Sequence, residues 1–279
     1  MADPLRPNLA DALAEWARRV QANNDQVAKY REAPERPDFY GPVASSFRAD
    51  PRRTDEPALS VLQSLVEPEE SWLDIGAGGG RYALPLALHA REVIAVEPSA
   101  GMLTVLREAM AEFGIDNIRI VESRWPMEAD PVTADVALIA HVGYDIADIG
   151  PFIDAMEASA KRLCVAVLLS KAPASLADTF WPAVHGVERV PLPALPEFLS
   201  LLLARGRLFE VRLSRRQPMT YHSAEDAARF LRQQLWVEPG SDKDQVLQRL
   251  ISERVEERDG RFAANWEETP IGIVTWRPG

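Results

Sequence analysis

A glycine-rich turn joins a short apolar strand to a helix in the first third of the chain. The turn reads Asp74-Ile75-Gly76-Ala77-Gly78-Gly79-Gly80, the strand is expected at 71–75, and the helix continues to about residue 90. Glycine permits a positive φ and lets a ligand approach the backbone closely. A strand, a glycine-rich turn and a helix in this order therefore indicate a nucleotide-like ligand at the turn.

Strands and helices alternate through most of the remaining chain. Further strands are expected at 92–96, 118–121, 135–140, 163–169, 208–213 and 271–276. Helices are expected at 8–31, 54–66, 99–113, 151–161, 197–204, 223–235 and 241–255. This alternation predicts a parallel sheet that is covered by helices. The unbroken Val and Leu residues of 163–169 are typical of a strand buried on both faces.

Composition and charge exclude several classes of protein. The chain is 47% hydrophobic and 26% charged, as in ordinary globular proteins, and no apolar run reaches the ~18 residues of a membrane-spanning helix. A net charge of −11 leaves no basic excess to neutralise phosphates, so nucleic acid is not expected as a partner. We expect the basic cluster of Arg212, Arg215 and Arg216 to be a solvated strand end.

The few cysteines and histidines give two further expectations. The single cysteine, Cys164, cannot form an internal disulfide and excludes a cysteine-based zinc site. No two histidines have the spacing of metal ligands, so no metal is expected. With no secretory signal visible before Trp16, we expect a cytoplasmic protein without a membrane partner.

Three details of the glycine-rich turn narrow its ligand. No Gly-Lys-Ser/Thr follows, so the turn is not a phosphate-binding P-loop. Arg81 stands where the dinucleotide fingerprint needs Gly or Ala. Asp74 precedes the first glycine, and a carboxylate there is poorly placed beside a pyrophosphate but well placed beside a cation.

Residues 74–80 resemble the first motif, D-x-G-x-G-x-G, of the class I S-adenosylmethionine-dependent methyltransferases. Glu97, at the end of the strand 92–96, resembles the acidic residue that accepts the ribose hydroxyls in that family. The resemblance covers about residues 55–215 and the last strand. It implies a doubly wound, mostly parallel seven-stranded α/β sheet, with S-adenosylmethionine as methyl donor and S-adenosylhomocysteine as product.

The chain is expected to have three regions, of which the last has two helices that depart from the minimal pattern of the family. Residues 1–54 are expected to form an N-terminal helix and a segment that covers the cofactor or substrate, and residues 55–215 to form the cofactor-binding core. Residues 216–279 are expected to form a helical lid or a homodimer face, followed by the strand that completes the sheet.

A further implication of the resemblance is a set of cofactor-binding residues. Met102 or Trp125 is expected to pack on the purine, while Ser123 or the adjoining backbone supplies hydrogen bonds. Arg48 or Arg81 is expected to meet the methionyl carboxylate. The full set is Asp74, Gly76, Ala77, Gly78, Glu97, Pro98, Met102, Ser123, Arg124, Trp125 and His141.

Two residues after the strand 135–140 are the catalytic candidates. His141 is the best candidate for a general base, because it stands at a strand end and its pKa is ordinarily close to neutral; packing or cofactor contact is the alternative. Tyr144 is expected to orient a hydroxyl or to pack against the sulfonium, or simply to line the pocket. The expected substrate-binding residues are Tyr40, Tyr144, Trp181 and His185.

These observations favour an S-adenosylmethionine-dependent methyltransferase that acts on a small-molecule acceptor by in-line displacement. Such chemistry needs mainly the positioning of the nucleophile, because the leaving group is already activated. Two alternatives stay open at this point: an NAD(P)-dependent oxidoreductase on a similar fold, and a non-catalytic S-adenosylmethionine-binding module.

Overall fold

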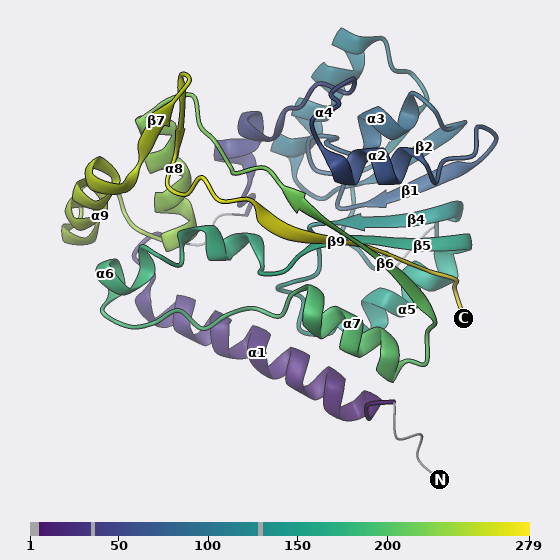
Figure 1. Cartoon of the computed structure of the whole chain (residues 1–279), viewed down its shortest axis with the longest axis horizontal. Helices are drawn as coiled ribbons and strands as arrows, with labels where there is room; N and C mark the ends of the chain where they lie inside the picture. Colours follow the sequence, from purple (N-terminus) through teal and green to yellow (C-terminus); the bar gives the residue numbers. More distant parts are fainter. Residues whose placement is uncertain (1–5, 35–36, 128–130) are drawn as a thin grey trace.

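A seven-stranded sheet forms the centre of the computed structural model, which describes residues 6–34, 37–127 and 131–279 (Figure 1). The strand order is β3-β2-β1-β4-β5-β9-β6. β1 to β5 are mutually parallel, and β9 is antiparallel to both of its neighbours, β5 and β6. The bounds are β1 Ser71–Ile75, β2 Glu92–Val96, β3 Ile118–Val121, β4 Ala134–Ala140, β5 Ala160–Leu169, β6 Phe209–Arg216 and β9 Thr269–Trp276. The mostly parallel sheet predicted from the sequence is confirmed.

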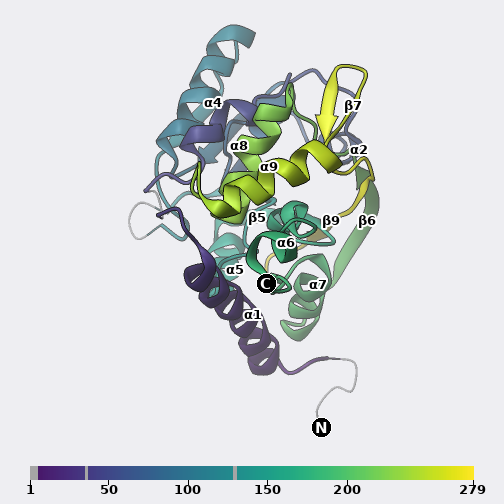
Figure 2. The ribbon, with the colours of Figure 1, turned by 90° about the vertical axis from the view of Figure 1, so that its left-hand side faces the viewer.

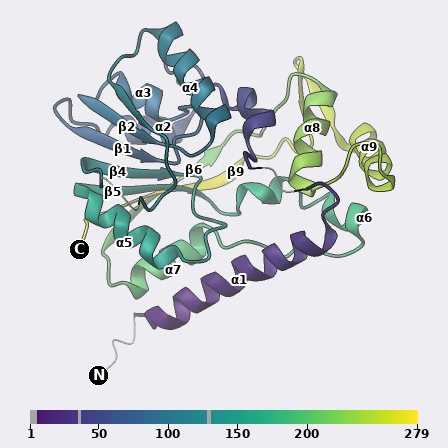
Figure 3. The same cartoon turned by 180° about the vertical axis from the view of Figure 1, so that it is seen from behind.

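Helices cover both faces of this sheet, as Figures 1 and 3 show. One face packs against α2 Pro57–Gln63, α3 Ala83–Ala87 and α4 Ala100–Phe113. The opposite face packs against α1 Leu9–Tyr30, α5 Ile149–Ser159 and α7 Leu195–Ala204. The remaining elements are η1 Gly41–Phe47, η2 Pro173–Ala177, α6 Trp181–His185, α8 Ala224–Leu235, α9 Asp242–Arg254, β7 Glu256–Arg258 and β8 Arg261–Ala263. Across the described residues, no helix is both long and apolar enough to span a bilayer.

Side-chain caps begin several helices where the sequence predicts them. The Ser99 hydroxyl accepts a hydrogen bond from the Met102 N–H, and Gly114 ends the same helix in the left-handed region at φ 65°. The start of α2 differs, because the helix begins at Pro57 after Glu56 rather than after Thr54. Proline suits the first helical position, where its missing N–H is not needed.

A second core lies outside the sheet and was predicted only in part. α6, α8, α9 and the β7–β8 hairpin form a unit that we call the helical cap. Phe180 and Trp181 pack there against Leu231, Leu235 and Leu247. The sequence predicts only a loop around Trp181, but its neighbouring apolar side chains give this stretch a buried face and hence a short helix. The cap stands beyond the sheet edge at which β6 ends, and Figure 2 shows it in front of the sheet.

β6 is three residues longer at its carboxyl end than predicted. It pairs with β9 as far as the register Arg216↔Thr269. Backbone pairing with β9 does not depend on side-chain polarity, so the polar residues after Leu213 remain in the strand. Arg212 and Arg215 are exposed, as expected for a solvated strand end, whereas Arg216 is half-buried.

Replacement of Trp181 tests whether the helical cap has a core of its own. The indole is fully buried among apolar side chains, so Trp181→Ala is expected to lower the free energy of unfolding of the cap by about 3–5 kcal/mol. Urea denaturation followed by circular dichroism measures the loss. Leu208→Ala, at a side chain that is 92% exposed, is the control and should change little. An unchanged denaturation midpoint in Trp181→Ala would contradict this packing.

Candidate functional site

Charged and polar side chains gather where the parallel strands end. Asp74 lies on β1, Glu97 follows β2, and His141 follows β4. β1 lies between β2 and β4, so all three carboxyl ends are at one edge of the sheet. In open α/β sheets ligands bind at this edge, where the strand order reverses.

The glycine-rich turn contains three glycines with positive φ, and they serve different purposes. A Cβ on Gly76 would lie 2.5 Å from a Val142 methyl, and a Cβ on Gly80 would lie 2.6 Å from a Leu106 methyl. These two positions therefore need glycine for packing as well as for backbone conformation. A Cβ on Gly78 would meet only the Met102 sulfur, at 3.9 Å. Gly78 thus borders open space, as a ligand-contacting glycine should.

Glu97 ties this turn to the start of α4. One carboxylate oxygen accepts a hydrogen bond from the Gly78 N–H at 2.9 Å, and the other accepts one from the Ser99 N–H at 2.9 Å. Burial raises the pKa of Glu97, although these hydrogen bonds oppose the shift. Each oxygen keeps a second lone pair, which can accept a hydrogen bond from a ligand hydroxyl.

Asp74 is buried beneath the same turn. The Ala83 N–H donates to its carboxylate, and Oδ1 has no hydrogen-bond partner among the described residues. Burial, and then the nearby charge of Glu97, raises the pKa of Asp74 to about 7. Two neighbouring carboxylates, one of them with a free oxygen, favour a cationic ligand that also donates hydrogen bonds.

Residues 37–48 pass over the turn, and we call them the N-terminal strap. Asp38 accepts hydrogen bonds from the Ser99 hydroxyl at 2.8 Å and from the Gly101 N–H at 3.0 Å. Gly101 needs to be glycine, because a Cβ there would lie 2.7 Å from the Gly41 Cα. Tyr40 is 43% exposed as a residue, yet burial of its phenol and the charges of Asp145 and Glu97 raise its pKa to about 12.

After β4 the chain turns sharply at His141, which has a φ of 60°. The imidazole is buried, and burial together with the charges of Arg216 and Arg81 holds its pKa well below the ordinary value. His141 is therefore neutral near pH 7. Tyr144 is also buried, and its hydroxyl oxygen accepts a hydrogen bond from the Leu169 N–H at 2.8 Å. That bond places Tyr144 beside the end of β5 and leaves its hydroxyl proton free to donate.

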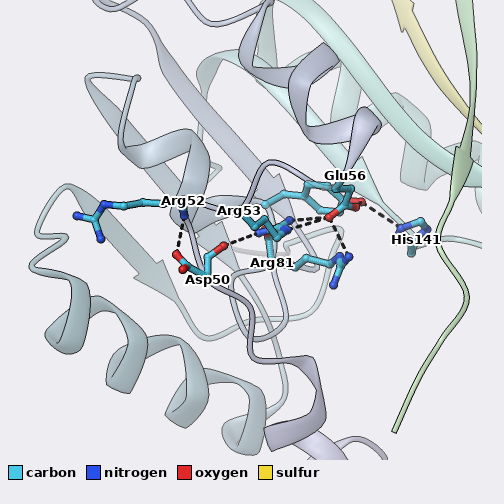
Figure 4. A network of polar contacts seen from close by, with 7 residues as sticks. Asp50, Arg52, Arg53, Glu56, Arg81 and His141 are labelled. Atoms are coloured by element: carbon cyan, nitrogen blue, oxygen red, sulfur yellow. Dashed lines mark hydrogen bonds and ion pairs between the residues drawn. The ribbon is translucent and has the colours of Figure 1, made fainter. Parts of the chain in front are cut away.

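A polar network connects His141 to the start of α2, as Figure 4 shows. Glu56 is at its centre: it accepts hydrogen bonds from Arg53, from Arg81 and from the Tyr82 hydroxyl, the last at 2.6 Å. The Tyr82 oxygen lies 3.3 Å from His141 Nε2. The cations Arg81 and Arg53 hold the pKa of Glu56 below its ordinary range despite burial, so Glu56 is a negatively charged carboxylate near pH 7.

This network determines the tautomer of His141. The Tyr82 hydroxyl has one proton, which it donates in a hydrogen bond to the Glu56 carboxylate. The Tyr82 oxygen must therefore accept the hydrogen bond from His141 Nε2–H. The remaining nitrogen, Nδ1, is then unprotonated. Nδ1 is buried, and no described group bonds to it. His141 therefore holds an unused lone pair at the sheet edge.

The other residues predicted to bind the cofactor differ in their surroundings. Met102 borders Gly78 and is buried, as the prediction requires. Pro98 lies between Glu97 and the helix cap Ser99. Trp125 packs against the core instead of standing free, and its Nε1 donates to the Phe152 carbonyl at 3.2 Å. Ser123 bonds to the Arg124 carbonyl, and Arg124 itself is exposed.

The structure gives Trp181 and His185 a different setting from the one expected for acceptor contacts. Both side chains lie inside the helical cap, with ring centroids 4.2 Å apart. His185 Nε2 is bonded to the Leu235 carbonyl at 2.9 Å. The expected acceptor-facing loop is thus a packed helix, because its aromatic side chains are more stable buried than exposed.

Arg48 and Arg81, of which one is expected to meet the methionyl carboxylate, both have protein partners in the structure. Arg48 forms ion pairs with Glu108 and Glu112 on α4. Arg81 forms an ion pair with Glu56.

Sequence analysis did not identify four residues that the structure places around the candidate site: Asp38, Glu56, Tyr82 and Arg216. Local sequence gives no distinguishing signal for Asp38 or Glu56, since other acidic residues such as Asp50 and Asp55 occur in the same stretch. Among residues 6–34, 37–127 and 131–279, no group of three or more His, Cys, Asp or Glu is placed to hold a metal ion.

Comparison with known proteins gives one family match. The profile of a family described as "Methyltransferase domain" matches residues 73–161, which include the glycine-rich turn, Glu97 and His141. A solved structure of the YcgJ protein from Bacillus subtilis is similar in fold, with a TM-score of 0.54 and 14% identity, over 80% of this chain and 98% of that protein.

Two curated relatives show how far sequence similarity extends. Ribosomal RNA small subunit methyltransferase G of Pseudomonas putida is 35% identical over 69 residues, which are 24% of this chain and 32% of that protein. "Probable cobalt-precorrin-6B C(15)-methyltransferase (decarboxylating)" of Methanobrevibacter smithii is 21% identical over 175 residues, 62% of this chain and 84% of that protein. Of two curated relatives that it matches, the chain spans well under half the length, 38% of one and 32% of the other.

The raised pKa of Asp74 predicts a pH-dependent stability. Its pKa is about 7 in the folded protein against an ordinary 3.8, so between these values the folded state binds more protons than the unfolded chain. The free energy of unfolding should therefore fall as the pH rises through this range. Asp74→Asn removes that decline and should be more stable than the original protein at about pH 8, by on the order of 1–3 kcal/mol.

Urea denaturation at about pH 5.5 and about pH 8 measures this difference. Asp116→Asn, at an exposed aspartate, is the matched control and should follow the original protein at both pH values. If the free energy of unfolding of Asp74→Asn changes with pH as that of the original protein does, then the Asp74 carboxyl group ionises at no cost in stability. That result would contradict a raised pKa of Asp74.

Proposed function

We propose that this protein, whose residues 73–161 match the "Methyltransferase domain" family, transfers a methyl group from S-adenosylmethionine to a small-molecule acceptor. One observation carries the proposal: two buried carboxylates, Asp74 and Glu97, lie close together at the glycine-rich turn, where Gly78 borders open space. Asp74 offers a negative charge to a cationic group, and Glu97 offers hydrogen-bond acceptors to a pair of hydroxyls. These two features match a ligand with cationic groups at one end and a ribose at the other.

The residues of the site fit this donor group by group. Asp74 Oδ1, buried and with no partner in the described part of the chain, offers an acceptor to an ammonium or sulfonium. The second lone pairs of the Glu97 carboxylate suit a pair of ribose hydroxyls. Met102 and the N-terminal strap supply an apolar wall and a cover. When bound, the donor supplies a methyl group already activated for displacement.

The chain itself must then position and deprotonate the acceptor. His141 Nδ1 is the candidate base, since Tyr82 fixes the ring through Nε2 and leaves Nδ1 free. The Tyr144 hydroxyl, anchored by the Leu169 N–H, is placed to donate to an acceptor oxygen or nitrogen. The strap and the helical cap at the same edge support exclusion of water from this space.

A dinucleotide is a weaker fit to the same turn. A pyrophosphate placed at Gly78 would bring two negative charges towards Asp74 and Glu97, whose pKa values are already raised by burial. Like charges in a buried site repel strongly.

A small acceptor is favoured over a macromolecule because the strap and the cap cover the sheet edge, and because the net charge is −11. The buried free thiol of Cys164 supports a cytoplasmic location.

Donor binding is tested with four ligands in parallel. Addition of S-adenosylmethionine or S-adenosylhomocysteine should raise the Tm, because a ligand that binds only the folded state stabilises it, whereas NADH and NADPH should not. Glu97→Ala should weaken S-adenosylmethionine binding in calorimetry by about 1–3 kcal/mol. Glu92→Ala, at the opposite end of β2, is the control. A Tm shift with a dinucleotide alone would overturn the proposal.

A role for His141 as base predicts a loss of turnover without an equal loss of donor affinity. His141→Gln should lower kcat by roughly a hundredfold or more, since general base catalysis typically contributes that much. The assay is transfer of labelled methyl from S-adenosylmethionine to a panel of hydroxyl, amine and thiol compounds. His89→Gln, at an exposed histidine, is the control. An unchanged kcat would reduce His141 to a packing residue, and binding of the donor with no methylated compound would favour a non-catalytic binding module.

A further inference from the structure

β6 brings an arginine to the edge of the sheet where the site lies. β6 and β5 are both antiparallel to β9, so they run in the same direction and end at the same edge. Ser214 and Leu169 are both paired with Ile271, which places Arg216 two residues beyond the level of Leu169. Leu169 is the residue whose N–H holds the Tyr144 hydroxyl. Arg216 therefore lies level with the acceptor side of the site.

The side chain of Arg216 is half-buried and makes no hydrogen bond or ion pair with the part of the chain that the structure describes. It is half-buried on the sheet face that α2 covers, whereas Arg212 and Arg215 are exposed. Within the described ranges no hydrogen bond or ion pair reaches its guanidinium. Burial, and then the charge of Arg81, lowers the pKa of Arg216, so the two cations are close enough to repel.

Positive charge is in excess at this place. Three guanidiniums, those of Arg53, Arg81 and Arg216, have one carboxylate between them, that of Glu56. Arg81 Nε is buried, and no described group accepts its hydrogen.

Among the side chains that the structure describes, none near Arg216 other than Glu56 supplies a negative charge. Burial raises the pKa values of Tyr82, Tyr144 and Tyr221, so these phenols are neutral, and His141 is neutral as well. A half-buried cation that has no hydrogen bond or ion pair of its own among the described residues costs stability, and such a cost is commonly retained where a ligand offsets it.

We propose that Arg216, together with Arg81, binds an oxyanion carried by the methyl acceptor, either a carboxylate or a phosphate. Guanidinium groups suit both, because their planar N–H donors match two anionic oxygens. The inference rests on the proposed function, since it assigns the anion to the acceptor of that reaction. The donor site lies at β1 and β2, and Arg216 lies across β4, β5 and β9 from it.

The test uses Arg216→Gln with Arg215→Gln as a matched control, because both remove one positive charge from the end of β6 but only Arg216 turns inward. The purified protein is saturated with S-adenosylhomocysteine. Acetate, benzoate, citrate, inorganic phosphate and phenyl phosphate are then added as sodium salts, against sodium chloride at equal ionic strength. Thermal shift and calorimetry give the affinity for each anion.

At least one organic anion is expected to bind the original protein and Arg215→Gln alike, and to bind Arg216→Gln roughly tenfold or more weakly. Preference for carboxylates or for phosphates identifies which oxyanion the acceptor carries. Equal affinities in the two variants, or no binding beyond that of chloride, would overturn the inference. Equal weakening of S-adenosylhomocysteine itself by Arg216→Gln would also overturn it, because the anion would then be the donor's own carboxylate.

Failure of the proposed function gives a different result, since S-adenosylhomocysteine would then fail to bind the original protein before any anion is added.

A stability measurement shows whether the Arg216→Gln variant is folded. Because Arg216 is an unpaired cation beside Arg81, Arg216→Gln should keep or raise the Tm without ligand. A marked fall in Tm would show that Arg216 is a structural cation and would contradict a ligand-binding role.

Discussion

Parallel pairing of β1 with β2 and β4 is the constraint on which the site depends. It places the ends of three strands at one edge, so that Asp74, Glu97 and His141 meet although they are far apart in the sequence. The turn between β1 and α3 must then pass under Val142 and Leu106, which is why Gly76 and Gly80 have no space for a side chain. Glu97 completes the arrangement by holding the Gly78 and Ser99 N–H groups together.

The edge is divided electrostatically by the order of the strands. At β1 and β2 the ionisable groups are carboxylates, with pKa values raised by burial. Beyond β1, Arg216 at the end of β6 lies near Arg53, Arg81 and the carboxylate of Glu56, and burial together with the charges of Arg216 and Arg81 keeps His141 neutral. A cation is thus favoured on one side and an anion on the other, a few strands apart on the same scaffold. A site that transfers a group from a cationic donor to an anionic acceptor needs such a division.

Local sequence was enough to predict the parts of the fold and site that depend on local chemistry. The strands, the caps at Ser99 and Gly114, the glycine-rich turn and the carboxylates after two strands all have signals within a few residues. Asp38, Glu56 and Arg216 could not be assigned in this way, because each acts on a partner brought near by the sheet order. The side on which Arg216 lies depends on its pairing with Thr269, more than fifty residues later. The aromatic residues around Trp181 were misassigned for a similar reason: their partners lie on α8 and α9.

The N-terminal strap is joined to two parts of the protein at once. Asp38 is bonded to Ser99 and Gly101 at the start of α4, while the next residue, Phe39, accepts a hydrogen bond from Gln233 and packs against Trp236 at the end of α8. A displacement of α8 therefore cannot leave the strap in place unless these contacts break. The start of α4, beside the glycine-rich turn, and the end of α8, in the helical cap, are therefore coupled through two adjacent residues, Asp38 and Phe39.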